Sequence, residues 1–249
     1  KIAPLMLRQS HAPSSTVFLD DAGKIAKVVL VDRFPSADDP PTGGQERRRE
    51  YEIVDGHLSG KAATWLGSPP RLFEVETYRQ DQRNGTTEYY SSTGELIYAC
   101  EFRGGRPWSG RTLARDGFEK VHWDVSYKDG KLHGEERQFA PDGALIRLRT
   151  LKAGVPDGLQ QSYHEGQLRS EEVVVEGVRR SGKSWHQNGQ LESEWYGRID
   201  GKPDGTRRAW NDRGELIAEE NFRHGKRHGR VWEQGHQELW YWEGTLLTP

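Results

Sequence analysis

Histidines are the first candidates for acid–base or metal chemistry in this sequence. Four of the nine lie at the glycine corners of a sequence repeat: His57, His133, His224 and His228. His224 and His228 have the i, i+4 spacing that brings two ligands to one metal ion on a helix. The residues between them are Gly-Lys-Arg, which favour a turn instead. We therefore expect surface histidines at turns and no metal site.

The single cysteine and the acidic pairs are the remaining candidates for catalysis. Cys100 alternates with Leu96 and Phe102, which predicts a buried thiol, and one cysteine excludes an internal disulfide or a cysteine-based zinc site. Asp20-Asp21 and Asp38-Asp39 are expected to be solvated. No nucleophile-elbow, P-loop or dinucleotide motif occurs. The sequence predicts no catalytic residue and no cofactor.

Tryptophan and arginine, the usual anchors of protein interfaces, supply the candidate partner-binding residues. They are Arg47, Arg48, Arg49, Trp185, Trp210, Trp232, Trp240 and Trp242. The alternative for the arginines is a solvated stretch of a polar insertion. The alternative for Trp185 and Trp210 is a core in which they stack, unit on unit, with Tyr90, Phe139 and Tyr163. Alternation places Trp240 and Trp242 on one face and Tyr241 on the other, where they cap an open sheet edge, the reading we favour, or anchor a partner.

The composition limits the elements that position these residues. Hydrophobic residues make up 33% of the 249 residues and mean hydropathy is −0.92, yet 10% are aromatic and 29 are glycine. This favours thin, turn-rich β structure over an ordinary core or disorder. The 36 basic and 38 acidic residues nearly cancel, so no nucleic-acid partner is expected. No apolar run is long enough for a membrane-spanning helix, so we expect no integral membrane segment.

A repeat of about 24 residues organises the chain. Its opening glycines are Gly60, Gly85, Gly110, Gly134, Gly158, Gly182, Gly205 and Gly229, spaced 25, 25, 24, 24, 24, 23 and 24 residues apart. A second glycine closes a turn after an aromatic residue, as in Trp185-His-Gln-Asn-Gly189. Leucine commonly follows two residues later, and a second apolar residue comes further on: Phe102, Leu151, Val174 and Phe222. Each unit therefore reads as strand, turn, strand, turn.

The N-terminal region is an eroded version of this unit. A first hairpin is expected around Gly23, followed by a strand at 27–31. A polar, proline-rich insertion is expected over 35–50, too polar for a central strand. The chain then divides into a degenerate N-terminal repeat or cap at 1–59 and tandem hairpin repeats at 60–249.

The sequence motifs of the repeat resemble the bacterial variant of the MORN repeat. They are aromatic-x-x-x-Gly-x-Leu, as at Trp185 to Leu191 and Trp210 to Leu216, and Gly-Lys-x-x-Gly, as at Gly130 to Gly134. The resemblance covers about residues 60–235. It implies an elongated, twisted antiparallel sheet of tandem β-hairpins, and the pattern leaves almost no room for helix. MORN-type proteins include scaffolds, membrane-associated modules and neutralisers of toxins.

We therefore expect a non-enzymatic immunity or antitoxin protein that binds a bacterial toxic effector, such as a secreted lipase or phospholipase. The alternatives are a scaffold or membrane-associated module and, less favoured, a carbohydrate-acting enzyme using Glu192, Glu194 or Glu219. End-to-end self-association through open sheet edges is a further expectation. Because the sequence begins at Lys1, we expect the periplasm if a leader has been cleaved and the cytoplasm otherwise.

Overall fold

The computed structural model describes residues 14–35, 44–115, 121–199 and 202–247, and every regular element in them is a β-strand. The chain forms two units, one of residues 1–120 and 127–130, the other of residues 121–126 and 131–249. We call them unit 1 and unit 2. The expected all-β fold of consecutive antiparallel hairpins, without helix in the described residues, is confirmed. None of these residues forms a helix long and apolar enough to cross a membrane.

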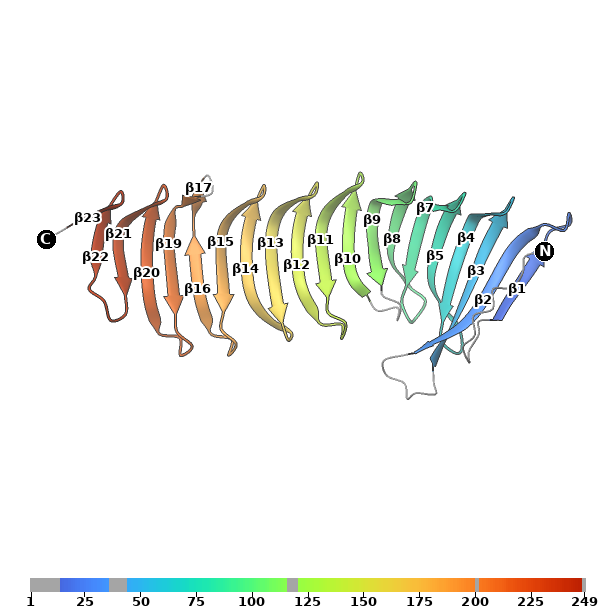
Figure 1. Cartoon of the computed structure of the whole chain (residues 1–249), viewed down its shortest axis with the longest axis horizontal. Helices are drawn as coiled ribbons and strands as arrows, with labels where there is room; N and C mark the ends of the chain where they lie inside the picture. Colours follow the sequence, from blue (N-terminus) through green and yellow to red (C-terminus); the bar gives the residue numbers. More distant parts are fainter. Residues whose placement is uncertain (1–13, 36–43, 116–120, 200–201, 248–249) are drawn as a thin grey trace. The chain divides into compact units, whose positions relative to one another are not determined.

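Unit 1 contains nine strands that pair antiparallel in sequence order, except that β5 pairs with both the two-residue β6 and β7 (Figure 1). They are β1 (Ser14–Leu19), β2 (Ile25–Pro35), β3 (Gly44–Val54), β4 (His57–Leu66), β5 (Arg71–Arg79), β6 (Gln82–Arg83), β7 (Gly85–Tyr90), β8 (Leu96–Arg103) and β9 (Arg106–Arg115).

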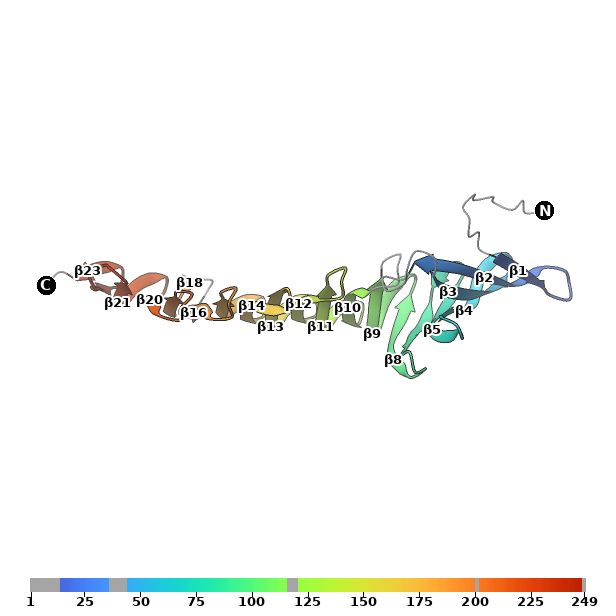
Figure 2. The same cartoon turned by 90° about the horizontal axis from the view of Figure 1, so that it is seen from below.

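Unit 2 continues the same pattern, and Figure 2 shows its sheet edge-on as one layer. Its strands are β11 (Lys131–Phe139), β12 (Leu145–Lys152), β13 (Val155–His164), β14 (Gln167–Val175), β15 (Val178–Trp185), β16 (Leu191–Tyr196), β19 (Gly205–Trp210), β20 (Leu216–Arg223), β21 (Lys226–Glu233), β22 (Leu239–Trp242) and β23 (Thr245–Leu247). β17 (Arg198–Ile199) and β18 (Lys202–Pro203) form a separate small hairpin, and β10 (Val121–Lys128) has residues in both units.

The turns follow the glycine pattern. At Gly189 the chain has φ +84°, and the Gly189 amide donates to the carbonyl of His186 at 2.9 Å. Asp129 and Gly130 both have positive φ, as a two-residue hairpin turn with the twist of its strands requires. Turn amides also join successive repeats, since Gly154 N donates to Leu132 O and Gly177 N donates to Pro156 O. The turns at Gly154 and Gly177 thus each satisfy a strand carbonyl of the preceding repeat.

The apolar positions predicted after each leucine form much of the small core. Phe102, Leu151 and Val174 are at most 5% exposed, whereas Phe222 is half-buried. The predicted aromatic stack is wrong: Tyr90, Phe139, Tyr163, Trp185 and Trp210 are all half-buried, and no ring contact joins them to one another. Equivalent residues lie two strands apart, about 9–10 Å. That exceeds the roughly 4.5–7 Å over which rings interact. Each aromatic instead lies across its hairpin from a leucine, as Trp185 does from Leu191.

The insertion expected over 35–50 is also shorter than predicted. Residues 44–50 belong to β3, which pairs with β2 on one side and β4 on the other, so a charged segment forms a central strand. Its arginines are compensated by acids on β2 and β3. Residues 36–43, with the predicted pair Asp38-Asp39, lie outside the described residues.

Candidate partner-binding surface

The five predicted tryptophans share one face of unit 2. Cross-strand pairing puts Lys183, Glu194, Arg208, Glu219 and Trp232 in one row on this face. Trp185 and Trp210 lie two residues along from members of that row. Trp240 pairs with Arg230, which alternates with Trp232, and Trp242 follows two residues later. We call this surface, defined by Trp185, Trp210, Trp232, Trp240 and Trp242, the tryptophan face.

Ion pairs hold the middle of the tryptophan face. Arg208 Nε donates to Glu219 Oε2 at 2.8 Å, and its Nη1 donates to Glu194 Oε1 at 3.2 Å. These hydrogen bonds, the one to Glu219 first, raise the pKa of the Arg208 guanidinium above its usual value. Glu194 and Glu219 are therefore the counterions of Arg208. Glu192, the third carboxylate considered for sugar chemistry, accepts a hydrogen bond from Ser184 Oγ at 2.9 Å.

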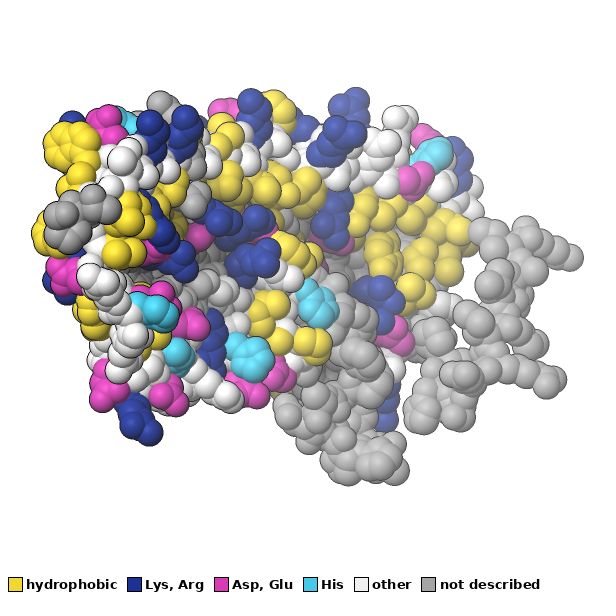
Figure 3. Space-filling view, turned by 60° about the vertical axis from the view of Figure 1, so that its left-hand side comes forward, with side chains coloured by type: hydrophobic (Ala, Val, Ile, Leu, Met, Phe, Trp, Pro, Cys, Tyr) yellow, Lys and Arg dark blue, Asp and Glu magenta, His cyan; other side chains and the backbone are white. Residues whose placement is uncertain are grey.

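The most exposed aromatic surface lies at the end of unit 2. Trp240 is 52% exposed and Trp242 58%, and Leu247, paired with Trp240 across β22 and β23, is 51% exposed. We call these three residues the terminal patch. Figure 3 shows hydrophobic side chains gathered at this C-terminal end, beside acidic and basic ones.

The surroundings of the terminal patch fix its rings. The His228 ring lies 4.6 Å from that of Trp242, centroid to centroid, and Trp240 Nε1 donates to Glu238 Oε1 at 3.0 Å. Glu238 also pairs with Arg230 at 3.3 Å. Because β23 lies outside β22, the two tryptophans project from a sheet face and do not cap its edge. Tyr241, as predicted, is on the other face, where the Arg227 guanidinium lies 5.6 Å from its ring.

The arginine run belongs to unit 1. Arg47 and Arg49 both reach Asp32 Oδ2, at 2.8 and 3.2 Å, while Arg48 points to the opposite face, where it pairs with Glu50 and lies over the Trp65 ring. Hydrogen bonding to Arg47, above all, holds the pKa of Asp32 below its usual value. The expectation that the run is simply solvated is wrong for Arg47 and Arg49, which are half-buried partners of Asp32, whereas Arg48 is exposed.

Cys100 lies where the sequence placed it, but only His224 of the four histidines expected at turns lies in a turn; the others belong to strands, namely His57 to β4, His133 to β11 and His228 to β21. Cys100 is buried, and burial raises the pKa of its thiol to about 11. His57, the first residue of β4, is exposed, and its Nδ1 lies 2.7 Å from Asp81 Oδ2. Across the part of the chain that the structure describes, no three His, Cys, Asp or Glu side chains are grouped to hold a metal ion.

Sequence reasoning missed the opposite face of unit 2, which carries Ser162, Ser170, Ser184 and Ser193 in one cross-strand row. We call it the serine face. Trp195 lies on it, over Gly182: a Cβ there would be 2.6 Å from the indole Nε1. The signal was strand alternation, since Trp195 follows Ser193 by two residues.

No protein-family model matches this chain, and no curated protein does.

Proposed function

We propose that this chain is a non-enzymatic binding protein that neutralises a bacterial toxic effector by direct protein–protein contact. The observation that carries the proposal is the terminal patch, where two tryptophans of one strand are more than half exposed. Exposed tryptophan is costly to leave in water and is enriched where interfaces concentrate their binding energy.

The surroundings of the patch match the anatomy of a protein interface. Arg230, Glu238 and His228 surround the rings with polar groups that hold them in place. An apolar centre with a polar rim is the usual arrangement at such sites. The remaining tryptophans extend the same face across β15 to β21.

Neutralisation by binding requires area and complementarity instead of reactive groups. A stable protein interface buries roughly 800 Å² on each partner, and a single-layer sheet with an open face offers that without rearrangement. The resemblance of the repeats to bacterial MORN-type proteins, some of which neutralise toxins, supports the same function.

A neutralisation assay tests the proposal. Genes adjacent to the one encoding this chain would be expressed singly in bacteria, with and without this chain. We expect one of them to arrest growth, and co-expression to restore growth with recovery of a stoichiometric complex. If no neighbouring product is both toxic and rescued, the proposed function is wrong.

A further inference from the structure

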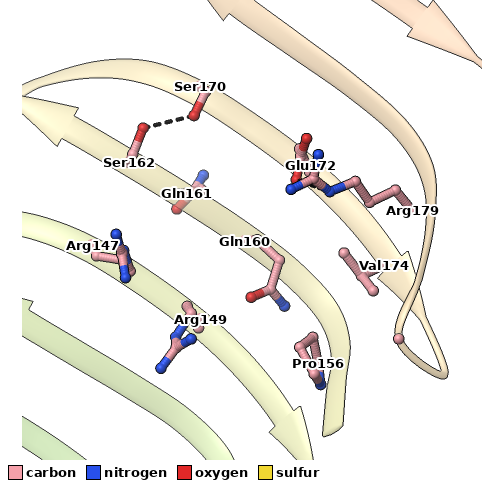
Figure 4. Close-up of a pocket in the computed structure, with 11 residues that line it drawn as sticks. Arg147, Arg149, Pro156, Gln160, Gln161, Ser162, Ser170, Glu172, Val174 and Arg179 are labelled. Atoms are coloured by element: carbon pink, nitrogen blue, oxygen red, sulfur yellow. Dashed lines mark hydrogen bonds and ion pairs between the residues drawn. The ribbon is translucent and has the colours of Figure 1, made fainter.

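A groove crosses the serine face of unit 2 from β12 to β15. It has a volume of about 450 Å³. Figure 4 shows its main lining residues: Arg147 and Arg149 from β12, Ser162 from β13, Ser170 and Glu172 from β14, and Arg179 from β15. Small side chains in the middle row leave the space, since Ser162 and Ser170 pair directly across the strands.

The charges in the groove do not cancel. Arg149 is bonded to the buried Glu136, and Arg179 Nε lies 3.1 Å from Glu172 Oε2. Arg147 is exposed and makes no ion pair or side-chain hydrogen bond with any residue in the described ranges. Three guanidinium groups thus meet two carboxylates, and the uncompensated one, that of Arg147, is exposed.

The polar side chains on the floor of the groove keep hydrogen-bond donors that their internal hydrogen bonds do not use. Ser162 Oγ and Ser170 Oγ are 2.6 Å apart, so one hydroxyl donates to the other and the second hydrogen remains for a ligand. Arg149 uses Nε and Nη2 on Glu136, which leaves its Nη1 hydrogens. The Gln160 amide nitrogen already donates to the Thr150 carbonyl at 2.9 Å and supplies no further charge. A ligand that accepts hydrogen bonds and carries negative charge fits these donors.

We propose that this groove binds an acidic segment of the protein partner, with an Asp or Glu carboxylate held by the Arg147 guanidinium. This inference rests on the proposed function for the identity of the partner, but the acidic chemistry follows from the groove. A guanidinium binds a carboxylate through two parallel hydrogen bonds. The open sheet face admits an extended chain, and the row of small residues continues through Ser184, Ser193 and Ala209.

Arg147 is the residue to change, because its neighbours are structural. Removing Arg149 would leave Glu136 buried without its cation, whereas Arg147 is exposed and holds nothing. Arg213, an exposed arginine in the turn between β19 and β20, is the matched control for a change of net charge.

The test is binding of fluorescein-labelled hexaglutamate to the full chain, followed by fluorescence anisotropy, with hexaglutamine as the uncharged probe. We expect hexaglutamate to bind and hexaglutamine not to bind, and we expect the affinity for hexaglutamate to fall as the salt concentration is raised. Arg147→Glu should weaken binding about tenfold, and Arg213→Glu less than about twofold. Equal effects of the two substitutions, or no binding of hexaglutamate, would overturn the proposal. So would displacement by inorganic phosphate well beyond that by chloride at equal ionic strength, since the site would then be a small-anion site.

The outcomes separate this inference from the proposed function. Arg147-dependent binding of hexaglutamate without any neutralised effector would keep the acidic groove and reject the function. Full neutralisation by the Arg147→Glu variant, together with no binding of hexaglutamate by the wild-type chain, would keep the proposed function and reject the acidic groove.

Discussion

Arg149 directs two donors at a single oxygen of Glu136, with Nε at 3.0 Å and Nη2 at 2.6 Å. The two residues face each other across β11 and β12, and the Glu136 side chain is 5% exposed. A thin sheet with a small apolar core thus keeps a buried carboxylate that is paired with one arginine. Removing that arginine leaves the carboxylate buried and unpaired.

We therefore expect Arg149→Gln to lower the free energy of unfolding by about 2–3 kcal/mol. Lys152→Gln on the same strand is the control. Lys152 makes only a 4.0 Å pair with Asp157 and its side chain is 70% exposed, so the expected cost is below about 1 kcal/mol. Urea denaturation followed by circular dichroism measures both. Equal losses of unfolding free energy in the two variants would show that the ion pair between Arg149 and Glu136 stabilises the fold no more than the exposed pair of Lys152.

The contact between Gly182 and Trp195 gives a second prediction. Gly182 has no positive φ, so only the indole excludes a side chain there. Gly182→Ala should lower stability by about 1–3 kcal/mol, because the indole must move. In a chain that also carries Trp195→Leu, Gly182→Ala should change stability very little. A double-mutant cycle detects this coupling between the two positions. Additive costs in that cycle would mean that the contact does not limit position 182.

The Cys100 thiol makes stability depend on alkaline pH. Its pKa is about 11 in the folded chain, from a usual value of 9.0, because burial disfavours the thiolate. A raised pKa gives stability that is complete below the unfolded value and is lost as pH rises toward the folded value. Wild type should therefore lose more stability than Cys100→Ala between about pH 8 and pH 10.5. Parallel loss in the two proteins would contradict this.

Asp32 gives the opposite dependence at acid pH. Its pKa is lowered, first by hydrogen bonding to Arg47, so its contribution is present above the unfolded value of 3.8 and is lost as pH falls through the folded value. Asp32→Asn should therefore cost stability at neutral pH, and the cost should shrink below about pH 4. Urea midpoints of the two proteins along a pH series provide the test. A cost that stays constant with pH would show that the Arg47 pair does not stabilise the fold.

The sequence was most informative about local structure. Glycine spacing predicted the turns, and the leucine-to-apolar spacing found Phe102, Leu151 and Val174 in the core. β3 was missed because a charged strand is recognisable only with its partners, and Asp32 is 15 residues from Arg47. Trp195 was missed because a bulge at Trp185 shifts the pairing of β15 and β16, and assigning its face requires the register beyond that bulge.

The candidate surface was predicted in part. Alternation correctly separated Trp240 and Trp242 from Tyr241, but their exposure depends on β23, a three-residue strand with little sequence signal. Arg147 was not found because an unpaired arginine is visible only once the acids around it are placed.

The measurement that tests the central claim is the affinity of the neutralised effector for the wild-type chain and for Trp240→Ala/Trp242→Ala, by titration calorimetry. The double variant should bind at least about tenfold more weakly, because exposed tryptophans are where interfaces concentrate binding energy. Leu96→Ala/Ile97→Ala, which removes exposed apolar residues from unit 1, is the control and should bind as wild type does. Undiminished binding by the tryptophan variant, in a protein shown to be folded, would contradict the account.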